Sequence, residues 1–211
     1  MGLLLEALDD ALGTTSKVRL LRALLRLTHA VTGREAARLA GVSQTAARRA
    51  LDDLVALGIL ERAVGTGEHR YVLNRENVLV RQALPPLFAA EDERSRAVIE
   101  TIREAFTGGP DALGARPRAV AVLDAATPRD PATLLVIVAT KAAVPDAEVV
   151  AAALAPRIRN RFGLRLESTV LQLDRFRELH AAGEALVRKW VAAAIPVTGD
   201  PLERLVGGAG R

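Results

Sequence analysis

Apolar residues in the first part of the chain recur at helical spacing. They do so over residues 3–12 and again over 16–30, where Ser16 is placed to cap the second segment. Thr32 is placed to cap a third segment, GREAARLA. The pattern therefore predicts two helices followed by the start of a compact helical motif.

A tight turn and a longer helix complete this motif. Gly41 and Val42 supply the turn, and Ser43 is placed to cap a helix that stops at Gly58. Beyond it, ILERAV, GTGE and HRYVL predict two short strands around a Gly-containing hairpin loop. The sequence thus predicts helix, turn and helix, followed by a β-hairpin.

The pattern then changes twice. From Val78 to about Phe106 it is mostly helical, although Pro85 and Pro86 interrupt it, and TGGP ends it. Further on, the pattern predicts an α/β unit. It is made of strands RAVAVL and TLLVIVA, helix DAEVVAAALAPRIRNRFG, strand LRLESTVLQL and helices from Asp174 through Ile195. We expect an α+β protein. Its predicted parts are a helical domain with a hairpin over 1–77, a helical connector over 78–110 that contains the domain boundary, an α/β domain over 111–206 and a flexible tail over 207–211.

Composition adds limits to this organisation. The length of 211 residues favours two compact units, and 50% hydrophobic with 3% aromatic residues suits closely packed helices. A net charge of +4 favours anionic partners without naming one. The absence of Cys excludes disulfides, thiol nucleophiles and thiolate zinc sites, and a reducing, cytoplasmic location is the simplest expectation.

The sequence also argues against a membrane role. The start, MGLLLEALDDAL, has no basic region and its apolar run is cut by Glu6, Asp9 and Asp10, so we do not expect a signal peptide. The longest apolar stretches are far shorter than the roughly 20 residues that cross a bilayer. We expect no membrane partner.

The helix that begins at Ser43 divides its side chains between two roles. Ala47, Leu51 and Leu54 fall on one side for packing, while polar residues project from another. The stretch TGREAARLAGVSQTAARRALDDLVALGIL, with the following hairpin, resembles winged helix-turn-helix regulators of the MarR and ArsR kind. The resemblance implies binding to double-stranded DNA through Ser43, Gln44, Thr45, Arg48, Arg49, Thr66, His69 and Arg70.

Two other interpretations of the helix-turn-helix remain open. Arg48 and Arg49 are four residues before Asp52 and Asp53, so they fit a solvated helix face with internal ion pairs. Helix-turn-helix units also serve as protein-interaction modules, which would make this chain an antitoxin-like partner.

The second half resembles the nucleotidyltransferase domain of the DNA polymerase beta superfamily. The resemblance rests on the order of strands and helix and on the ending ALVRKWVAAAIPVTGDPLERL. In active members a Gly-Ser pair holds the nucleotide and two aspartates hold magnesium. Here Asp124 and Ala125 occupy the Gly-Ser positions, and the two aspartate positions fall near Pro131 and Thr133. The resemblance implies an inactive domain with no catalytic residues, metal or cofactor; Asp124, Asp130 and Glu167 are the carboxylates left nearby.

Together these features predict a homodimeric, sequence-specific transcriptional regulator. The connector helices of residues 78–106 are the expected dimer element, and the degenerate domain would sense a nucleotide-like ligand, support assembly or bind a partner protein. The alternatives are an active nucleotidyltransferase that a winged helix targets, or an interaction module without a DNA role.

Overall fold

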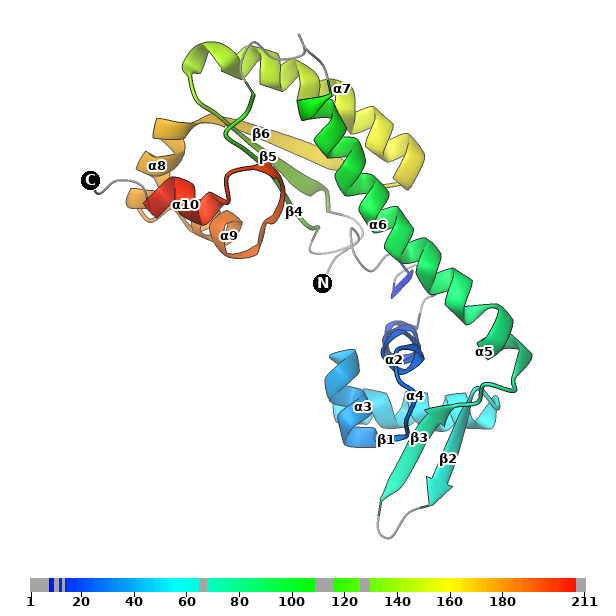
Figure 1. The fold of residues 1–211 in the computed structure, drawn as a ribbon. Coiled ribbons are helices and arrows are strands. Elements are labelled where there is room, and N and C mark those ends of the chain that lie inside the picture. The colour runs from blue at the N-terminus through cyan, green and yellow to red at the C-terminus, as the bar shows by residue number, and fades with distance from the viewer. Residues whose placement is uncertain are drawn as a thin grey trace. The chain divides into compact units, whose positions relative to one another are not determined.

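The structure is a computed structural model that describes residues 8, 9, 12, 14–64, 68–108, 116–125 and 130–207. The chain divides between Glu93 and Arg94 into two compact units, at a point inside the predicted connector. We call them the N-terminal and the C-terminal unit, and Figure 1 labels their elements. The predicted helix over 3–12 lies mostly outside the described residues, as do Thr66 and most of the predicted tail.

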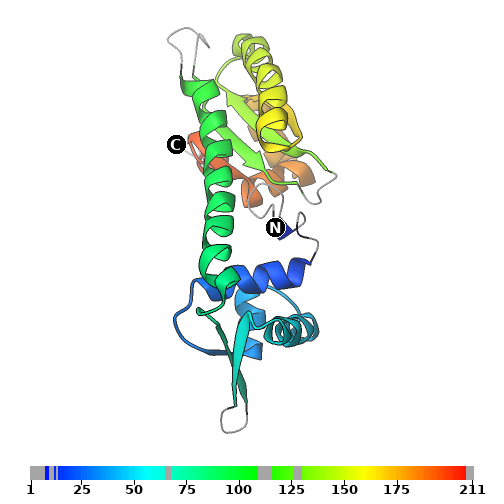
Figure 2. The ribbon, with the colours of Figure 1, turned by 90° about the vertical axis from the view of Figure 1, so that its right-hand side faces the viewer.

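The N-terminal unit combines helices with a small antiparallel sheet. The strands follow the order β1-β3-β2, and the β2–β3 hairpin extends beyond the helices (Figure 2). The predicted hairpin is confirmed, whereas the short strand β1, which pairs with β3, was missed because two residues carry no periodicity. The elements are α2 (Thr15–Leu25), β1 (Val31–Thr32), α3 (Gly33–Ala40), α4 (Gln44–Ala56), β2 (Leu60–Val64), β3 (His69–Leu73) and α5 (Val78–Gln82).

Two of the three predicted helix caps are present. The Thr32 hydroxyl accepts a hydrogen bond from the Glu35 amide at 3.2 Å, and Ser43 caps α4 in the same way. The prediction for Ser16 was wrong, because α2 already begins at Thr15 and the residue in the N-cap position, Thr14, makes no side-chain cap bond. Thr32 and Ser43 fix where the two motif helices start, since each satisfies an amide that the helix leaves without a partner.

One apolar core holds α2, α3 and α4 together. Leu20 and Leu24 of α2, Leu51 and Leu54 of α4, and Tyr71 of β3 are all buried in it. The packing side predicted for α4 is therefore confirmed, Ala47 included. Small alanines on α3 and α4 let the two helices approach each other closely, which positions the exposed side of α4 relative to the hairpin.

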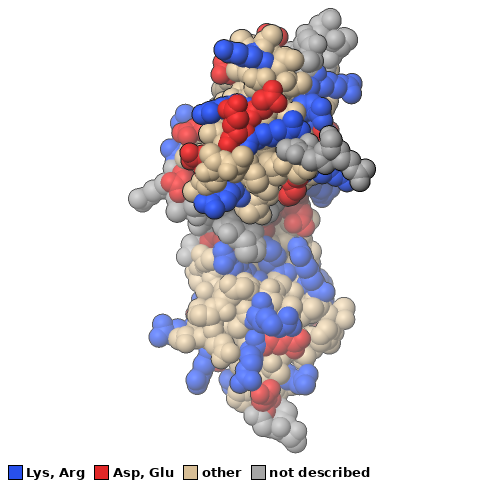
Figure 3. All heavy atoms as spheres, turned by 90° about the vertical axis from the view of Figure 1, so that its left-hand side faces the viewer, with Lys and Arg blue, Asp and Glu red and all other residues tan. Residues whose placement is uncertain are grey.

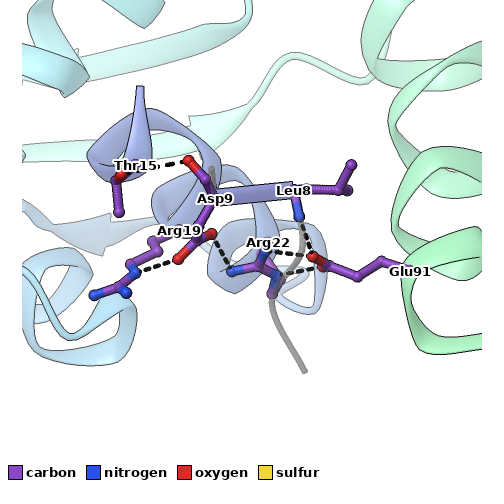
Figure 4. A network of polar contacts seen from close by, with 6 residues as sticks. All are labelled: Leu8, Asp9, Thr15, Arg19, Arg22 and Glu91. Atoms are coloured by element: carbon purple, nitrogen blue, oxygen red, sulfur yellow. Dashed lines mark hydrogen bonds and ion pairs between the residues drawn. The ribbon is translucent and has the colours of Figure 1, made fainter. Parts of the chain in front are cut away.

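A buried network of charges ties α2 to the start of α6 within the N-terminal unit (Figure 4). The guanidinium of Arg22 binds both carboxylate oxygens of Glu91, at 2.9 and 3.0 Å, and lies 2.9 Å from Asp9. Asp9 also pairs with Arg19, and the Leu8 amide donates to Glu91 at 2.8 Å. The side chains of Asp9 and Glu91 are only 5% and 2% exposed, so both negative charges depend on these arginines.

The C-terminal unit is a four-stranded sheet with helices on both faces (Figure 1). The strand order is β6-β5-β4-β7, with β5 and β6 parallel and the other neighbours antiparallel. Helices α6 and α7 cover one face, and α8, α9 and α10 cover the other. The elements are the part of α6 (Leu84–Thr107) that follows Glu93, β4 (Ala119–Leu123), β5 (Ala132–Val138), a 3-10 turn (Lys141–Ala143), α7 (Val144–Phe162), β6 (Leu166–Gln172), α8 (Leu173–Ala181), α9 (Ala185–Ala193), β7 (Ile195–Gly199) and α10 (Leu202–Gly207).

The predicted α/β character of this unit is confirmed, with one correction. The sequence predicted helices through Ile195, but α9 ends at Ala193 and the chain enters β7. This strand was missed because it is short, contains Pro196 and meets β4 with a register shift between Val120 and Ala121. The helical stretch that begins at Val78 is broken at Ala83, next to the two prolines, but Pro85 and Pro86 themselves lie in the first turn of α6, where proline is tolerated.

We expect Gly199→Ala to destabilise the C-terminal unit by more than about 2 kcal/mol. Gly199 has φ +83°, and a Cβ atom there would lie 2.3 Å from the carbonyl oxygen of Arg118, the residue before β4. Denaturation followed by the fluorescence of Trp190, the single tryptophan and buried in the adjoining core, would measure the loss. Gly207→Ala is the matched control, because its added Cβ would meet nothing within 4 Å; equal effects at both sites would contradict the prediction.

Candidate nucleic-acid interface

Helix α4 presents a polar face to solvent at its N-terminal end. Gln44, Thr45, Arg48 and Arg49 are all exposed, while the opposite side of the helix is buried in the core. The division predicted from the sequence is therefore present in the structure. A helix of this kind can place long polar side chains in a groove of DNA, since its back is held by packing.

The acids on α4 pair with residues of other elements, so the internal pairs of the solvated-face interpretation are not formed. Asp53 lies 2.7 Å from the Lys17 ammonium on α2, and Asp52 lies 3.7 Å from the Arg62 guanidinium on β2. Within the part of the chain that the structure describes, neither Arg48 nor Arg49 has an ion-pair partner. Both guanidinium groups are therefore available to an anion.

A groove of about 570 Å³ separates α4 from the β2–β3 hairpin, and we call it the α4–hairpin groove. Gln44, Thr45 and Arg48 line it from α4, and Arg62 and His69 line it from the strands. Arg34, at the start of α3, lies at the same groove. The acids Asp52 and Glu68 also line the groove, so three arginines and two acids surround one hollow, and this net positive lining suits a phosphate backbone.

The two predicted hairpin residues that the structure describes point in different directions. His69 lies on the same side of β3 as Tyr71 and lines the α4–hairpin groove. Arg70 lies on the other side, and its guanidinium donates to the carbonyl oxygen of Ala30 at 3.3 Å. His69 therefore shares a surface with α4, whereas Arg70 does not; Thr66 lies outside the described residues.

Ser43 is one of the residues for which the resemblance implied DNA binding, and in this structure it stabilises the start of α4. Its hydroxyl accepts a hydrogen bond from the Ala46 amide at 3.2 Å and so caps α4. The hydroxyl oxygen has a second lone pair and the side chain is exposed, so a contact with an anion is compatible with the cap. The cap decides where the polar end of α4 begins.

We expect Ser43→Ala to lower stability by about 1 kcal/mol, because the Ala46 amide would lose its acceptor at the start of α4. Thermal denaturation of the full chain would measure this loss. Ser43→Asp is the matched control, since an aspartate also caps a helix N-terminus and should keep most of the stability. A loss of the same size in both variants would contradict a capping role.

Sequence reasoning missed two arginines of the α4–hairpin groove. Arg34 is exposed in the first turn of α3, and the usual position of the first motif helix against the DNA backbone was a signal for it. Arg62 faces the groove because it pairs with Tyr71 across β2 and β3, and only the strand register reveals this. The Arg62–Asp52 pair is exposed and long, so it holds Arg62 only weakly.

Charge on the N-terminal unit is mainly positive on the side that carries α3. Figure 3 shows several Lys and Arg side chains projecting from this unit, around a small acidic group. Arg34 and Arg38, one helical turn apart on α3, are both exposed. An anionic partner would therefore meet arginines from α3 as well as from α4.

In the C-terminal unit, the carboxylates of Asp124, Asp130 and Glu167 lie in different surroundings. Asp124 follows β4 and accepts a hydrogen bond from the Ala125 amide at 2.8 Å, while Asp130 is exposed before β5. Glu167 is exposed on β6, opposite Thr133 of β5. Among the described residues, no group of three His, Asp or Glu side chains is arranged to hold a metal ion.

Among the described residues, no helix is both long enough and apolar enough to span a bilayer.

Comparisons with known proteins give weak similarities. No protein-family model and no curated protein matches the sequence. Similar solved structures include a MarR family transcriptional regulator from Silicibacter pomeroyi, which is 26% identical, covers 52% of this chain and 83% of its own, and has a TM-score of 0.35. Another is RV1404 from Mycobacterium tuberculosis, 21% identical over 50% of this chain and 75% of its own, with a TM-score of 0.30.

Proposed function

We propose that this protein is a sequence-specific regulator of transcription that binds double-stranded DNA through α4. The observation that carries the proposal is the polar end of α4, where Arg48 and Arg49 have no ion-pair partner among the described residues and Arg48 lines the α4–hairpin groove. A helix with a packed back and exposed arginines at its start fits the major groove of DNA.

Each side chain on this end of α4 has a base or phosphate that it suits. Gln44 can pair with adenine through two hydrogen bonds, and Arg48 or Arg49 with guanine or with a phosphate. Thr45 can contact a base edge or the methyl group of thymine. The contacts of Gln44 and the arginines would carry most of the sequence selection.

The rest of the groove would hold the DNA backbone. Arg34 lines the α4–hairpin groove from α3, and Arg62 and His69 line it from the strands β2 and β3. Contacts of this kind position a protein on DNA and add affinity, but they do not distinguish sequences. We therefore assign selection to α4 and general affinity to these residues.

We further propose that the protein acts as a homodimer through the region that starts at α5. Val78 and Leu79 are 57% and 59% exposed, and Leu57, 66% exposed, precedes Gly58, whose carbonyl accepts a hydrogen bond from the Asn77 side chain. An exposed apolar patch of this kind marks an interaction surface. A dimer would place two copies of α4 about 34 to 36 Å apart, or a multiple of it, on a pseudo-palindromic site.

We expect Val78→Gln with Leu79→Gln to shift the protein from dimer to monomer in light-scattering measurements of molar mass. The matched control is Val149→Gln, which removes an equally exposed apolar side chain from the C-terminal unit. A dimer that survives the double substitution would contradict this interface.

For the C-terminal unit we propose a role in ligand sensing or assembly without catalysis. Proline and threonine at positions 131 and 133 cannot replace two magnesium-binding carboxylates, which supports an inactive nucleotidyltransferase-like domain. Incubation with labelled nucleotides, magnesium and candidate acceptors should give no transfer. Transfer that disappears when Asp124 or Glu167 is replaced would overturn this part of the proposal.

Selection of genomic DNA fragments by the purified full-length protein tests the main proposal. We expect a small set of enriched fragments that share a motif, and an affinity that falls steeply with salt. Equal affinity for all fragments would refute sequence selection. The absence of any DNA complex, together with a stable complex with another protein, would favour an interaction module instead.

A further inference from the structure

The C-terminal half of α7 and the loop after it carry an unusual concentration of positive charge. No Asp or Glu occurs between Glu148 and Glu167, whereas this stretch contains Arg157, Arg159, Arg161 and Arg165. All four arginines are exposed, and we call them the arginine patch. They belong to the C-terminal unit and play no part in the α4–hairpin groove.

Packing of α7 explains why these arginines face solvent. Ala151, Leu154 and Ile158 bury one side of α7 against β5 and β6, so the residues between them project outward. Arg157 and Arg161 are four residues apart and therefore share a face of the helix. Three arginines of the patch are thus held on a packed helix, and Arg165 lies in the loop after it.

Among the described residues, the four arginines of the patch have no acidic partner. Within the described residues, none of the four takes part in an ion pair, although other exposed arginines of this unit, such as Arg118 and Arg175, do. The guanidinium of Arg161 lies 5.1 Å from the ring centre of Phe162, which limits its movement. Arg159 and Arg161 also lie in the last turn, where the helix dipole favours cations, but Arg157 and Arg165 lie outside that turn.

The surroundings of the arginine patch indicate which kind of anion fits it. The exposed residues from 156 to 165 include Asn160 and Gly163, and no large apolar side chain is exposed among them. Protein partners usually require apolar or aromatic anchors at the centre of an interface. Interfaces with DNA are instead polar and strongly positive, and arginine binds phosphate through two parallel hydrogen bonds.

We infer that the arginine patch is a second DNA-binding surface, which contacts the phosphate backbone of duplex DNA without selecting a sequence. It is separate from the selective contacts proposed for α4. The C-terminal unit thereby adds affinity to any duplex, and its contribution depends on salt because each phosphate contact releases counterions.

The test measures binding of the full chain to a duplex of random sequence at several salt concentrations. The parent protein for this test is the variant that carries Arg48→Ala and Arg49→Ala, so that α4 contributes little to the measured affinity. Adding Arg157→Gln and Arg161→Gln should make the slope of log affinity against log salt less steep by about 1 to 2, since each lost phosphate contact removes about 0.9. Arg157→Lys with Arg161→Lys should keep most of the slope, because the charge stays.

A matched control separates the arginine patch from net charge. Arg175→Gln with Arg188→Gln removes the same charge from exposed positions of the same unit and should leave the slope nearly unchanged. Equal losses in the two double variants, an unchanged slope in the patch variant, or a parent that does not bind duplex DNA would each overturn the inference. These outcomes are independent of whether the unaltered protein selects a sequence, which tests the proposed function of α4.

Discussion

Replacing Arg48 and Arg49 together with alanine is expected to remove the preference of this protein for its selected DNA while leaving the fold unchanged. Both side chains are exposed, and among the described residues neither forms an ion pair that the fold would lose. A good contact to a base is worth about 1 to 3 kcal/mol, so losing two should weaken binding to the selected fragment at least about thirtyfold. Titration of a labelled selected fragment, compared with a random duplex, measures the change.

Two further variants make this expectation specific to α4. Arg26→Ala with Arg81→Ala removes the same charge from exposed positions of the N-terminal unit outside the α4–hairpin groove, and should weaken binding far less. Arg48→Lys with Arg49→Lys keeps the charge but not the paired hydrogen bonds, so general affinity should survive while selection falls. If the alanine variant still prefers the selected fragment by the original ratio, α4 is not the reading helix.

Removing the Arg22 guanidinium is expected to be the most destabilising change in the N-terminal unit. Arg22→Ala would leave the carboxylate of Glu91 without its main partner at 2% exposure and would also take a partner from Asp9. Breaking a buried ion pair from one side costs about 3 to 5 kcal/mol. Urea denaturation, followed by the spectroscopic signal of Tyr71, would measure the loss in the free energy of unfolding. Tyr71 is the single tyrosine and is part of this unit's core.

The paired substitution separates uncompensated charge from lost packing. Arg22→Met with Glu91→Leu removes one charge of each sign and leaves Asp9 with Arg19, so it should recover much of the stability. Arg26→Ala, at an exposed position one turn further along, should change stability by no more than about 0.5 kcal/mol. A paired variant as unstable as Arg22→Ala would show that packing, and not charge, dominates.

The charge state of Arg22 sets only the alkaline limit of this stabilisation. Burial lowers the pKa of its guanidinium, but hydrogen bonds to Glu91 and Asp9 and their negative charges outweigh burial, so the pKa lies above its usual value. A folded-state pKa above the unfolded value stabilises the fold at every pH below the unfolded pKa, and the effect disappears only at more alkaline pH. Deprotonation of Arg22 should therefore play no part in stability between acid and moderately alkaline pH.

Local features of the fold could be predicted from the sequence because neighbouring residues decide them. Thr32 and Ser43 reveal the starts of α3 and α4, since a cap acts on an amide three residues away. The spacing of Ala47, Leu51 and Leu54 reveals which side of α4 is buried. The same spacing identifies Gln44 and Arg48 as the exposed side.

Other features depend on residues that only the folded chain brings together. Arg62 and His69 meet α4 at one groove because of the register between β2 and β3, and the same register turns Arg70 away. Glu91 meets Arg22 across 69 positions, which no local pattern reports. The missed strand β7 likewise exists through its pairing with β4.

The sequence by itself thus determined most of the helices and strands and the polar side of α4, because periodicity and capping act within a few residues. The tertiary structure alone decided which hairpin residues share a surface with α4, which acids pair with which arginines, and how the α/β sheet is completed. These depend on strand register and on the burial of charge, both of which arise from contacts between distant parts of the chain.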